Sequence, residues 1–257
     1  MANLHSYRAE FHVHTVLSPC AGVEMIPPLI IAEAERRGID LIAITDHNAT
    51  ANAGAVIAAA QGSTVHVLPG MELQTVEEVH LLCLFDDMQA AEAFQDQVDE
   101  NLPATPNNPD YFGEQFVVDE TGDFIRREDR LLLSSTRFTL EEAVQRVHAL
   151  GGMAIPAHIN RQAYGLIANL GFIPPASEFD ALEISRHLEL AQAVQVIPGA
   201  RRFPLIQSGD VHYLEDFLGA NTLTVQAPTL DEIRMAFNQK EGRSLTHSPA
   251  RVNAPLK

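Results

Sequence analysis

Basic residues are scarce in this sequence, and their scarcity bears on the partners the protein can have. Of its 257 residues only 17 are lysine or arginine, against 34 aspartates and glutamates, so the formal net charge is −17. Proteins that lie along long nucleic acid usually present a basic surface, so we expect no long nucleic acid among the partners. A small phosphorylated substrate or a nucleotide is not excluded, because divalent cations can reverse the sign of the electrostatic field inside a pocket.

Cysteine and long apolar runs are also lacking. Cys20 and Cys83 are the only cysteines, too few for a disulfide framework. The N-terminus lacks the apolar run of a signal peptide, and no stretch is long enough to cross a bilayer. These absences predict a reduced, soluble, cytoplasmic protein without a membrane partner, and they leave the oligomeric state unknown.

Apolar residues, by contrast, make up 46% of the chain, enough for the core of one large α/β domain or two small ones. Short apolar runs alternate with helix-like segments, the pattern of parallel strands joined by crossover helices. Strands are expected at 8–15, 41–44, 65–68, 79–85, 153–157, 181–184 and 203–206. Helices are expected at 27–37, 49–60, 139–150 and 229–237, and capping-box sequences open the last two.

The segment 87–138 interrupts this alternation. It contains one amphipathic helix near 88–98, a stretch rich in proline and asparagine at 102–109, and a small hairpin around Thr121-Gly122. About fifty residues with so few apolar side chains do not readily build a core of their own. We therefore interpret the chain, 1–257, as a single domain that carries an insertion or lid at about 87–138.

Two histidines at alternate positions, His12 and His14, mark the first strand. Their imidazoles leave the same face of the strand, which is how a sheet presents a pair of metal ligands, while Phe11 and Val13 occupy the opposite, apolar face. Other imidazoles and carboxylates lie at or near the ends of short apolar runs: Asp46, His47, Glu72, His80, His158, Asp210 and His212. In a barrel of parallel strands, such residues meet at the carboxyl rim.

The number and type of these side chains indicate a metal cluster. Imidazole together with carboxylate suits zinc, manganese or iron. A single four-coordinate ion needs only about three or four protein ligands, and this set is larger. We therefore expect two or three divalent ions bridged by a carboxylate.

The ordered motifs resemble those of the PHP (polymerase and histidinol phosphatase) family of metal-dependent phosphoesterases. The resemblance extends from about Tyr7 to Val225 and rests on His12-x-His14, Ile44-Thr45-Asp46-His47, Pro69-Gly70-x-Glu72, Pro156-Ala157-His158 and Gly209-Asp210-x-His212. It implies a distorted (β/α), TIM-like barrel of about seven strands with a di- or trinuclear metal cluster at the carboxyl rim.

The resemblance also implies a role for each ligand. One ion would be held by His12, His14, Glu72 and Asp210. Glu72 would bridge to a second ion held by His80 and His158, and His47 and His212 would hold a third. Asp46 would lie behind the ligands and orient an imidazole.

Three positions need comment against the family pattern. The distance of His80 from Glu72 varies within the family, and a histidine in a strand can also be a plain core residue. Glu10 stands where the family usually has aspartate, so its orienting hydrogen bond must come from a side chain one carbon longer. Cys20 lies in the loop that usually supplies a histidine or aspartate to the third ion. It could bind that ion as a thiolate, which would favour zinc; otherwise the third site would be weak or empty, and Cys20 would be a small buried residue.

We hypothesise from these features a metal-dependent hydrolase, a phosphatase that cleaves phosphate esters of a small phosphorylated metabolite or nucleotide by metal-activated water. Glu72, Asp210 and His212 would be the catalytic residues. Arg161 and Arg186 would bind the substrate phosphate, and His187 is a candidate acid. Arg126, Arg127 and Arg130 would belong to a lid. Two alternatives stay open: a 3'-5' exonuclease acting on short oligonucleotides, and a non-catalytic metal-binding module that docks on a partner.

Overall fold

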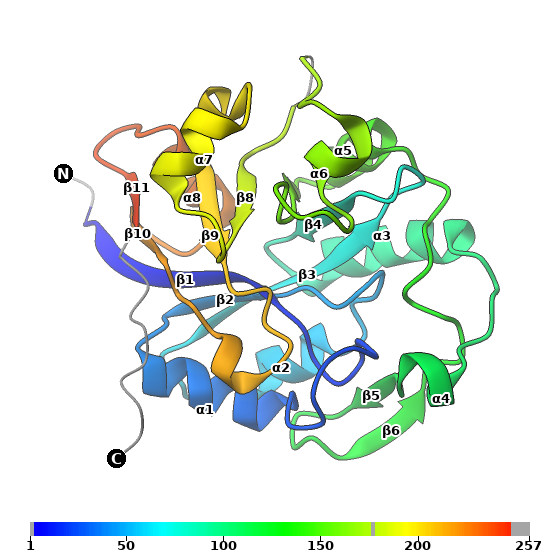
Figure 1. The fold of residues 1–257 in the computed structure, drawn as a ribbon. Helices are drawn as coiled ribbons and strands as arrows, with labels where there is room; N and C mark the ends of the chain where they lie inside the picture. The colour runs from blue at the N-terminus through cyan, green and yellow to red at the C-terminus, as the bar shows by residue number, and fades with distance from the viewer. Residues whose placement is uncertain (1–2, 176–177, 248–257) are drawn as a thin grey trace.

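The computed structural model describes residues 3–175 and 178–247, and within them a curled sheet surrounded by helices (Figure 1). The strands are β1 (His5–Val13), β2 (Leu41–Ile44), β3 (His66–Gln74), β4 (His80–Leu84), β5 (Phe116–Val118), β6 (Phe124–Arg127), β7 (Met153–Pro156), β8 (Leu182–Ser185), β9 (Leu205–Ser208), β10 (Asn221–Val225) and β11 (Ser244–His247). The α-helices are α1 (Pro27–Arg37), α2 (Ala53–Ala59), α3 (Met88–Asn101), α4 (Pro109–Phe112), α5 (Leu140–Ala149), α6 (Leu166–Leu170), α7 (Leu190–Val196) and α8 (Leu230–Phe237).

The main sheet has seven strands in the order β11-β10-β1-β2-β3-β4-β7. The parallel pair β8-β9 continues the wall beyond β7, since Asp180 donates a backbone hydrogen bond to Ala154, and it returns to β1 through a bridge between Val211 and Val13. Strands β1, β2, β3, β4, β7, β8 and β9 therefore surround the core, and β10 and β11 extend the sheet beyond β1. The predicted α/β fold with a distorted barrel is confirmed.

Strand β3 is longer than expected and brings Glu72 into the sheet itself. The chain crosses β4 very closely at Gly70, where an added Cβ would lie 2.6 Å from the carbonyl oxygen of Cys83, so only glycine fits there. Strand β4 then runs antiparallel to β3. This reversal places its first residue, His80, at the same rim as the ends of the parallel strands.

A β-bulge changes the course of β1. The pairing of β1 with β2 shifts register between Glu10 and Val13. Phe11 packs inside the barrel in the cluster that includes Leu41, whereas Val13 packs in the outer cluster that includes Ile30 of α1. The expectation that Phe11 and Val13 share one face is therefore wrong, because a bulge breaks the alternation of side chains.

Helix termini follow the sequence signals only in part. Helix α1 starts with two prolines and ends at Gly38, whose φ of 64° is the left-handed conformation that glycine favours. The capping box at Thr139 and Glu142 is present. The one expected at Thr229 is absent, because Glu232 instead accepts a hydrogen bond from the backbone of Gln226 and pairs with Arg243.

The segment 87–138 has two parts. Helix α3 buries Ala91, Phe94 and Val98 in the large core that also contains β4 and α5, so it is an ordinary helix of the outer layer. The hairpin β5-β6 forms as expected, and Figure 1 shows it with α4 at one side of the molecule, next to the loop after β1. Among the described residues, no helix is both long and apolar enough to cross a membrane.

Candidate metal centre

The carboxylate of Glu72 lies at the middle of a cluster of imidazoles. It projects from β3 and is 1% exposed. Its Oε1 lies 3.2 Å from Nε2 of His12, 2.8 Å from Nδ1 of His80 and 3.0 Å from Nε2 of His158. One carboxylate oxygen thus faces three imidazoles that come from three different strands or strand ends, as the barrel geometry predicts.

The second oxygen of Glu72 and the carboxylate of Asp210 extend this cluster. Glu72 Oε2 lies 3.0 Å from Nδ1 of His47 and 3.5 Å from Nε2 of His14. Asp210 Oδ1 lies 3.3 Å from Nδ1 of His212 and 3.4 Å from Nε2 of His14. It is also 3.3 Å from Nε2 of His12. The eight residues predicted as metal ligands besides Cys20 therefore meet in one place.

Three buried atoms of this cluster lack hydrogen bonds to the described residues: Nδ1 of His80, Nδ1 of His158 and Oδ1 of Asp210. Buried polar atoms are nearly always hydrogen-bonded, so such a group requires an explanation. Nδ1 of His80 approaches Glu72 to 2.8 Å without hydrogen-bond geometry. Nitrogen and oxygen atoms that face one another in this way are typical of atoms that share a cation, and the donor set fits divalent ions.

The charge states of Glu72 and His80 suit metal binding directly. Burial by itself would raise the pKa of Glu72, but the imidazoles of His80, His12 and His47 outweigh it and hold that pKa well below its usual range. Glu72 is therefore an anion. Burial lowers the pKa of His80 to about 4, although Glu72 opposes this shift. His80 is then a neutral imidazole with a lone pair to donate to a cation. At His47 and His212 burial would lower the pKa, but neighbouring carboxylates and Cys20 raise it to about 10 and about 11, so an ion bound there would displace a proton from each ring.

Cys20 completes the outer side of the cluster. Its Sγ lies 3.3 Å from Nε2 of His47 and 3.1 Å from Nε2 of His212. Desolvation opposes ionisation of the thiol, but the charge of His47 and the hydrogen bonds of both imidazoles lower its pKa to about 6. The residue is exposed, so the alternative of a small buried residue is wrong.

Glu183 on β8 supports the centre, a role that the sequence analysis did not predict. Its carboxylate is fully buried and accepts a hydrogen bond from Nδ1 of His12 at 3.0 Å and another from the backbone N–H of His158 at 3.0 Å. One side chain therefore fixes two of the ligands. The only signal was an acidic residue inside the apolar run Ala181–Ile184.

The two supporting residues expected from the resemblance act less directly than predicted. Among the described residues, Glu10 forms no hydrogen bond with an imidazole. It accepts backbone hydrogen bonds, each 2.9 Å long, from Gly209, Leu218 and Gly219, which anchors the loop that carries Asp210. The second residue, Asp46, orients an imidazole through a hydroxyl group.

Ser18 supplies that hydroxyl group. It donates to Asp46 at 2.7 Å, and its oxygen lies 2.9 Å from Nδ1 of His14. A proton on Nδ1 leaves Nε2 of His14 free to bind an ion.

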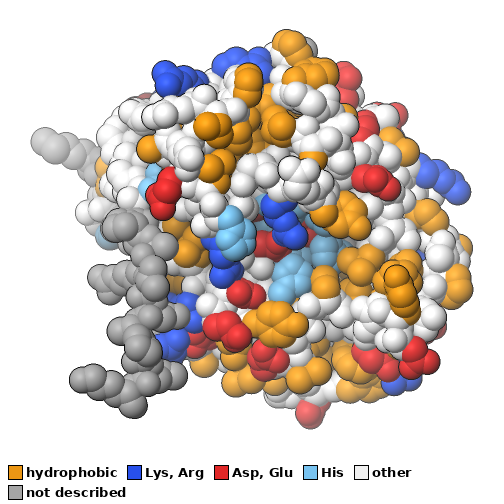
Figure 2. Space-filling view, viewed as in Figure 1, with side chains coloured by type: hydrophobic (Ala, Val, Ile, Leu, Met, Phe, Trp, Pro, Cys, Tyr) orange, Lys and Arg blue, Asp and Glu red, His pale blue; other side chains and the backbone are white. Residues whose placement is uncertain are grey.

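A cleft of ≈ 330 Å³ borders Asp210 and contains both predicted substrate-binding arginines, together with His187. Arg161 pairs with Asp210 at its edge. The guanidinium group of Arg186 donates hydrogen bonds to the carbonyl oxygens of Gly209 and Asp216, so it supports the wall of the cleft. Figure 2 shows histidine, arginine and acidic side chains gathered at the floor of a hollow near the middle of this face.

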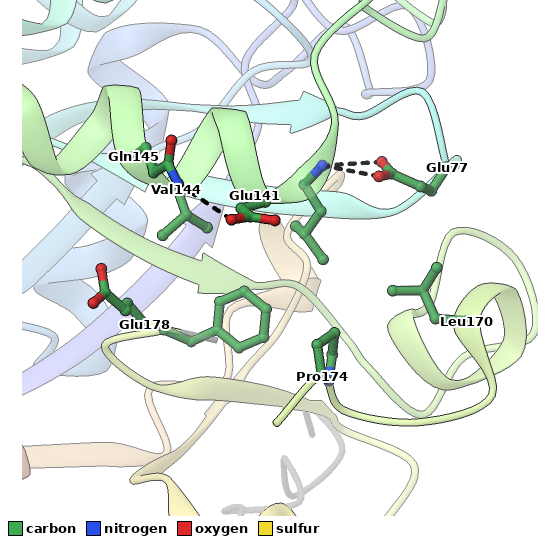
Figure 3. Close-up of a pocket in the computed structure, with 9 residues that line it drawn as sticks. Glu77, Glu141, Val144, Gln145, Leu170, Pro174 and Glu178 are labelled. Carbon is green, nitrogen blue, oxygen red and sulfur yellow. Dashed lines mark hydrogen bonds between the residues drawn. The ribbon is translucent and has the colours of Figure 1, made fainter. Parts of the chain in front are cut away.

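A second cavity, of ≈ 370 Å³, lies beside α5 and is drawn in Figure 3. Its walls are mainly apolar, and its polar groups include Glu77, Glu141 and Glu178. Glu77 accepts hydrogen bonds from the backbone of Leu140 at the start of α5. The lining contains neither imidazole nor arginine, so this cavity does not suit a phosphate ester.

The comparisons with known proteins agree with the fold and the ligand motifs. Residues 10–93 match the PHP domain family, and this range contains the ligands from His12 to His80. The predicted resemblance to this family is confirmed over that range. No curated protein matches the sequence.

Solved structures share the fold at low sequence identity. The endonuclease Q of Pyrococcus furiosus, a lesion-specific endonuclease, has a TM-score of 0.71 and 17% identity, and the match covers 94% of this chain and 58% of that one. A protein of Bifidobacterium adolescentis assigned as a metal-dependent phosphoesterase has a TM-score of 0.55 and 17% identity, and the match covers 90% and 96%. The chain thus spans little more than half of endonuclease Q.

One prediction about partners has to be corrected. An endonuclease Q structure with a TM-score of 0.68 and 18% identity, matched over 94% of this chain and 58% of that one, holds a 27-mer duplex with an abasic lesion at the active site. A fold of this kind can therefore act on long nucleic acid, and the expectation that such a partner is excluded is wrong. Net charge counts the whole chain, whereas a duplex contacts one face.

Proposed function

We propose that this chain is a phosphoesterase that hydrolyses phosphate esters of a small phosphorylated metabolite or nucleotide at a centre of two or three divalent ions. The observation that carries the proposal is the convergence of five imidazoles on the single carboxylate of Glu72. The cleft that contains Arg161 lies directly beside this cluster and gives a phosphate group a place to bind.

The ligands divide into three groups by the distances between their atoms. The first consists of His12, His14 and Asp210, with Glu72 in contact with both imidazoles. The second consists of Glu72, His80 and His158. The third is formed by the outer nitrogens of His47 and His212, which the loop after β1 faces.

Divalent ions held by these groups would supply Lewis-acid stabilisation of the phosphate and an activated water near neutral pH. The protein's own side chains would bind and orient the substrate. Arg161 can offer two N–H groups to non-bridging phosphate oxygens, which gives direction as well as charge. His187, in the same cleft, would hold the proton that the leaving alkoxide needs.

A second candidate is cleavage of phosphodiester bonds in nucleic acid. The likeness to endonuclease Q over most of this chain favours it. Two exposed aromatic side chains lie in the segment 87–138, Tyr111 in α4 and Phe124 in β6, and β6 also carries the exposed Arg126 and Arg127. Aromatic and arginine side chains are the groups on which unpaired bases stack.

Metal analysis and a substrate panel test both candidates. The protein would be purified without chelator or affinity metal, analysed for its ions, and assayed with zinc, manganese and iron on phosphomonoesters, nucleotides, short oligonucleotides and a duplex with an abasic site. We expect two or more ions per chain and turnover of one substrate class, lost in Asp210→Ala. Glu141→Gln, at the cavity of Figure 3, is the matched control and should change neither. Full metal loading without turnover of any substrate would contradict the proposal and favour the docking module.

A further inference from the structure

We propose that Cys20 is a metal ligand, so that the outer ion of the centre is bound by one sulfur and two nitrogen atoms and is selected for zinc. The site consists of Cys20 Sγ, His47 Nε2 and His212 Nε2. This inference rests on the metal centre of the proposed function and adds a chemical difference between its ions. The other ligand groups offer only nitrogen and oxygen.

The distances within this group are close to those of a tetrahedral zinc site. Sγ lies 3.3 Å from Nε2 of His47 and 3.1 Å from Nε2 of His212. With zinc–sulfur bonds of about 2.3 Å and zinc–nitrogen bonds of about 2.0–2.1 Å, tetrahedral angles separate the ligand atoms by about 3.5 Å. Small movements of the side chains would therefore admit the ion.

Both imidazoles are oriented from the inner side by an oxygen atom. Nδ1 of His47 lies 3.0 Å from the carboxylate of Glu72, and Nδ1 of His212 donates a hydrogen bond of 3.0 Å to the backbone carbonyl oxygen of Asp210. In each ring the inner nitrogen therefore faces an acceptor, and the outer nitrogen faces Cys20. This is the arrangement in which a carboxylate or a backbone carbonyl group fixes the tautomer of a histidine that binds a metal.

The loop that carries Cys20 is held in place by the backbone. Gly22 donates a hydrogen bond of 2.8 Å to the carbonyl oxygen of His212, so the two ligand segments are tied together. On the other side the loop packs against Gly113, where an added Cβ would lie 2.2 Å from the carbonyl oxygen of Pro19. The thiol is thus positioned before any ion binds.

The chemistry of the thiolate determines which ion this site prefers. Sulfur is a soft ligand that suits zinc, whereas manganese and magnesium prefer oxygen. Three protein ligands leave a fourth position of a tetrahedral ion open, and because Cys20 is exposed this position faces solvent. We therefore expect one zinc ion that persists on the outer side when the other ions are exchanged for manganese.

Cobalt(II) provides a direct test, because a thiolate bound to cobalt gives a charge-transfer band in the near ultraviolet. The metal-free full-length protein would be titrated with cobalt chloride. We expect the band in the unaltered protein and in Cys83→Ser, which changes the buried cysteine, and its complete loss in Cys20→Ser. Cys20→Asp should bind as much cobalt as the unaltered protein but show no band. Circular dichroism checks that each variant is folded.

Competition between zinc and manganese gives a second readout. In excess manganese the unaltered protein should retain one zinc ion per chain, and Cys20→Asp should lose it. A sulfur band that persists in Cys20→Ser, or full cobalt loading of the unaltered protein without a band, would overturn the inference. Neither readout needs turnover, so an inactive protein with an intact band would contradict the phosphoesterase proposal alone.

Discussion

The inner and outer halves of the candidate metal centre are built in different ways. The inner half, which we define as His12, Glu72, His80 and His158, is at most 4% exposed. Its first three residues lie in strands, and His158 is the second residue after β7. The outer half, Cys20, His47 and His212, comes from loops, and Cys20 is exposed. Loops tolerate change more readily than strands of the core do. The comparison teaches that the sheet holds the inner ligand atoms in place, whereas the geometry of the outer half depends on the loop that carries Cys20.

The supporting contacts follow the same division. Glu183 fixes two ligands of the inner half from behind, by bonds to a side chain and to a backbone. In the outer half, Nδ1 of His47 faces the carboxylate of Glu72, which belongs to the inner half, and Nδ1 of His212 donates to the backbone carbonyl oxygen of Asp210. The outer half therefore depends on the inner half, whereas the reverse does not hold.

Removing the charge of Glu72 should have the largest effect, because both halves depend on it. In Glu72→Gln the side chain keeps its size but no longer offers two anionic oxygens to five imidazoles. We expect loss of all bound ions and a fall in turnover greater than the about 10–100-fold that follows loss of an outer-shell partner. Elemental analysis and kcat measure the two effects. Retained ions would show that the halves are independent.

Glu183→Gln should have the next largest effect and should act first on the inner half. The amide can accept one hydrogen bond from His12 but cannot balance the charge of the imidazole, so we expect metal affinity to fall about 10–100-fold. Competition with a chelator measures the affinity of each ion. The exposed Glu178→Gln is the matched control. If the outer ion weakened while the inner ions did not, the division into halves would be wrong.

The convergence of the inner half can largely be predicted from the sequence, because the positions of most of its residues follow from strand geometry. His12 lies near the end of β1, and His158 follows β7 by two residues. Glu72 follows the predicted strand 65–68, although the observed strand β3 continues through it. His80 begins its strand, and it reaches the rim only because β4 is antiparallel, which periodicity does not reveal. Its assignment depended on the family resemblance.

The supporting residues could not be predicted, because they depend on contacts between segments far apart in the chain. Glu183 meets His12 across 171 residues, and no local pattern distinguishes it from a surface acid placed within a strand. Ser18 acts only through the loop that brings its hydroxyl between Asp46 and His14. The bulge in β1 is likewise a property of the pairing of β1 and β2.

Arg161→Lys should reduce turnover less than the two substitutions above, and both halves of the centre should still bind their ions. Lysine keeps the positive charge but loses the paired N–H groups, so the phosphate is bound less well. A hydrogen bond to a charged group contributes about 1.5–3 kcal/mol, and we expect a loss of this order, mainly as a higher KM. Arg201→Lys, at an exposed position outside the cleft, is the control. An unchanged KM would show that Arg161 only pairs with Asp210.

The smallest effect is a difference in reactivity between the two cysteines of the metal-free protein. The imidazoles of His47 and His212 lower the pKa of Cys20 to about 6, so most of this thiol is ionised at pH 7 and the thiolate fraction falls below pH 6. Burial raises the pKa of Cys83, which also lies out of reach of reagents. Iodoacetamide at pH 7 should therefore modify Cys20 alone, more slowly at pH 5, and an added zinc ion should protect it. Iodoacetamide reports only on Cys20, which belongs to the outer half. Equal labelling with and without zinc would therefore mean that the outer half binds no ion through sulfur, regardless of how many ions the inner half binds.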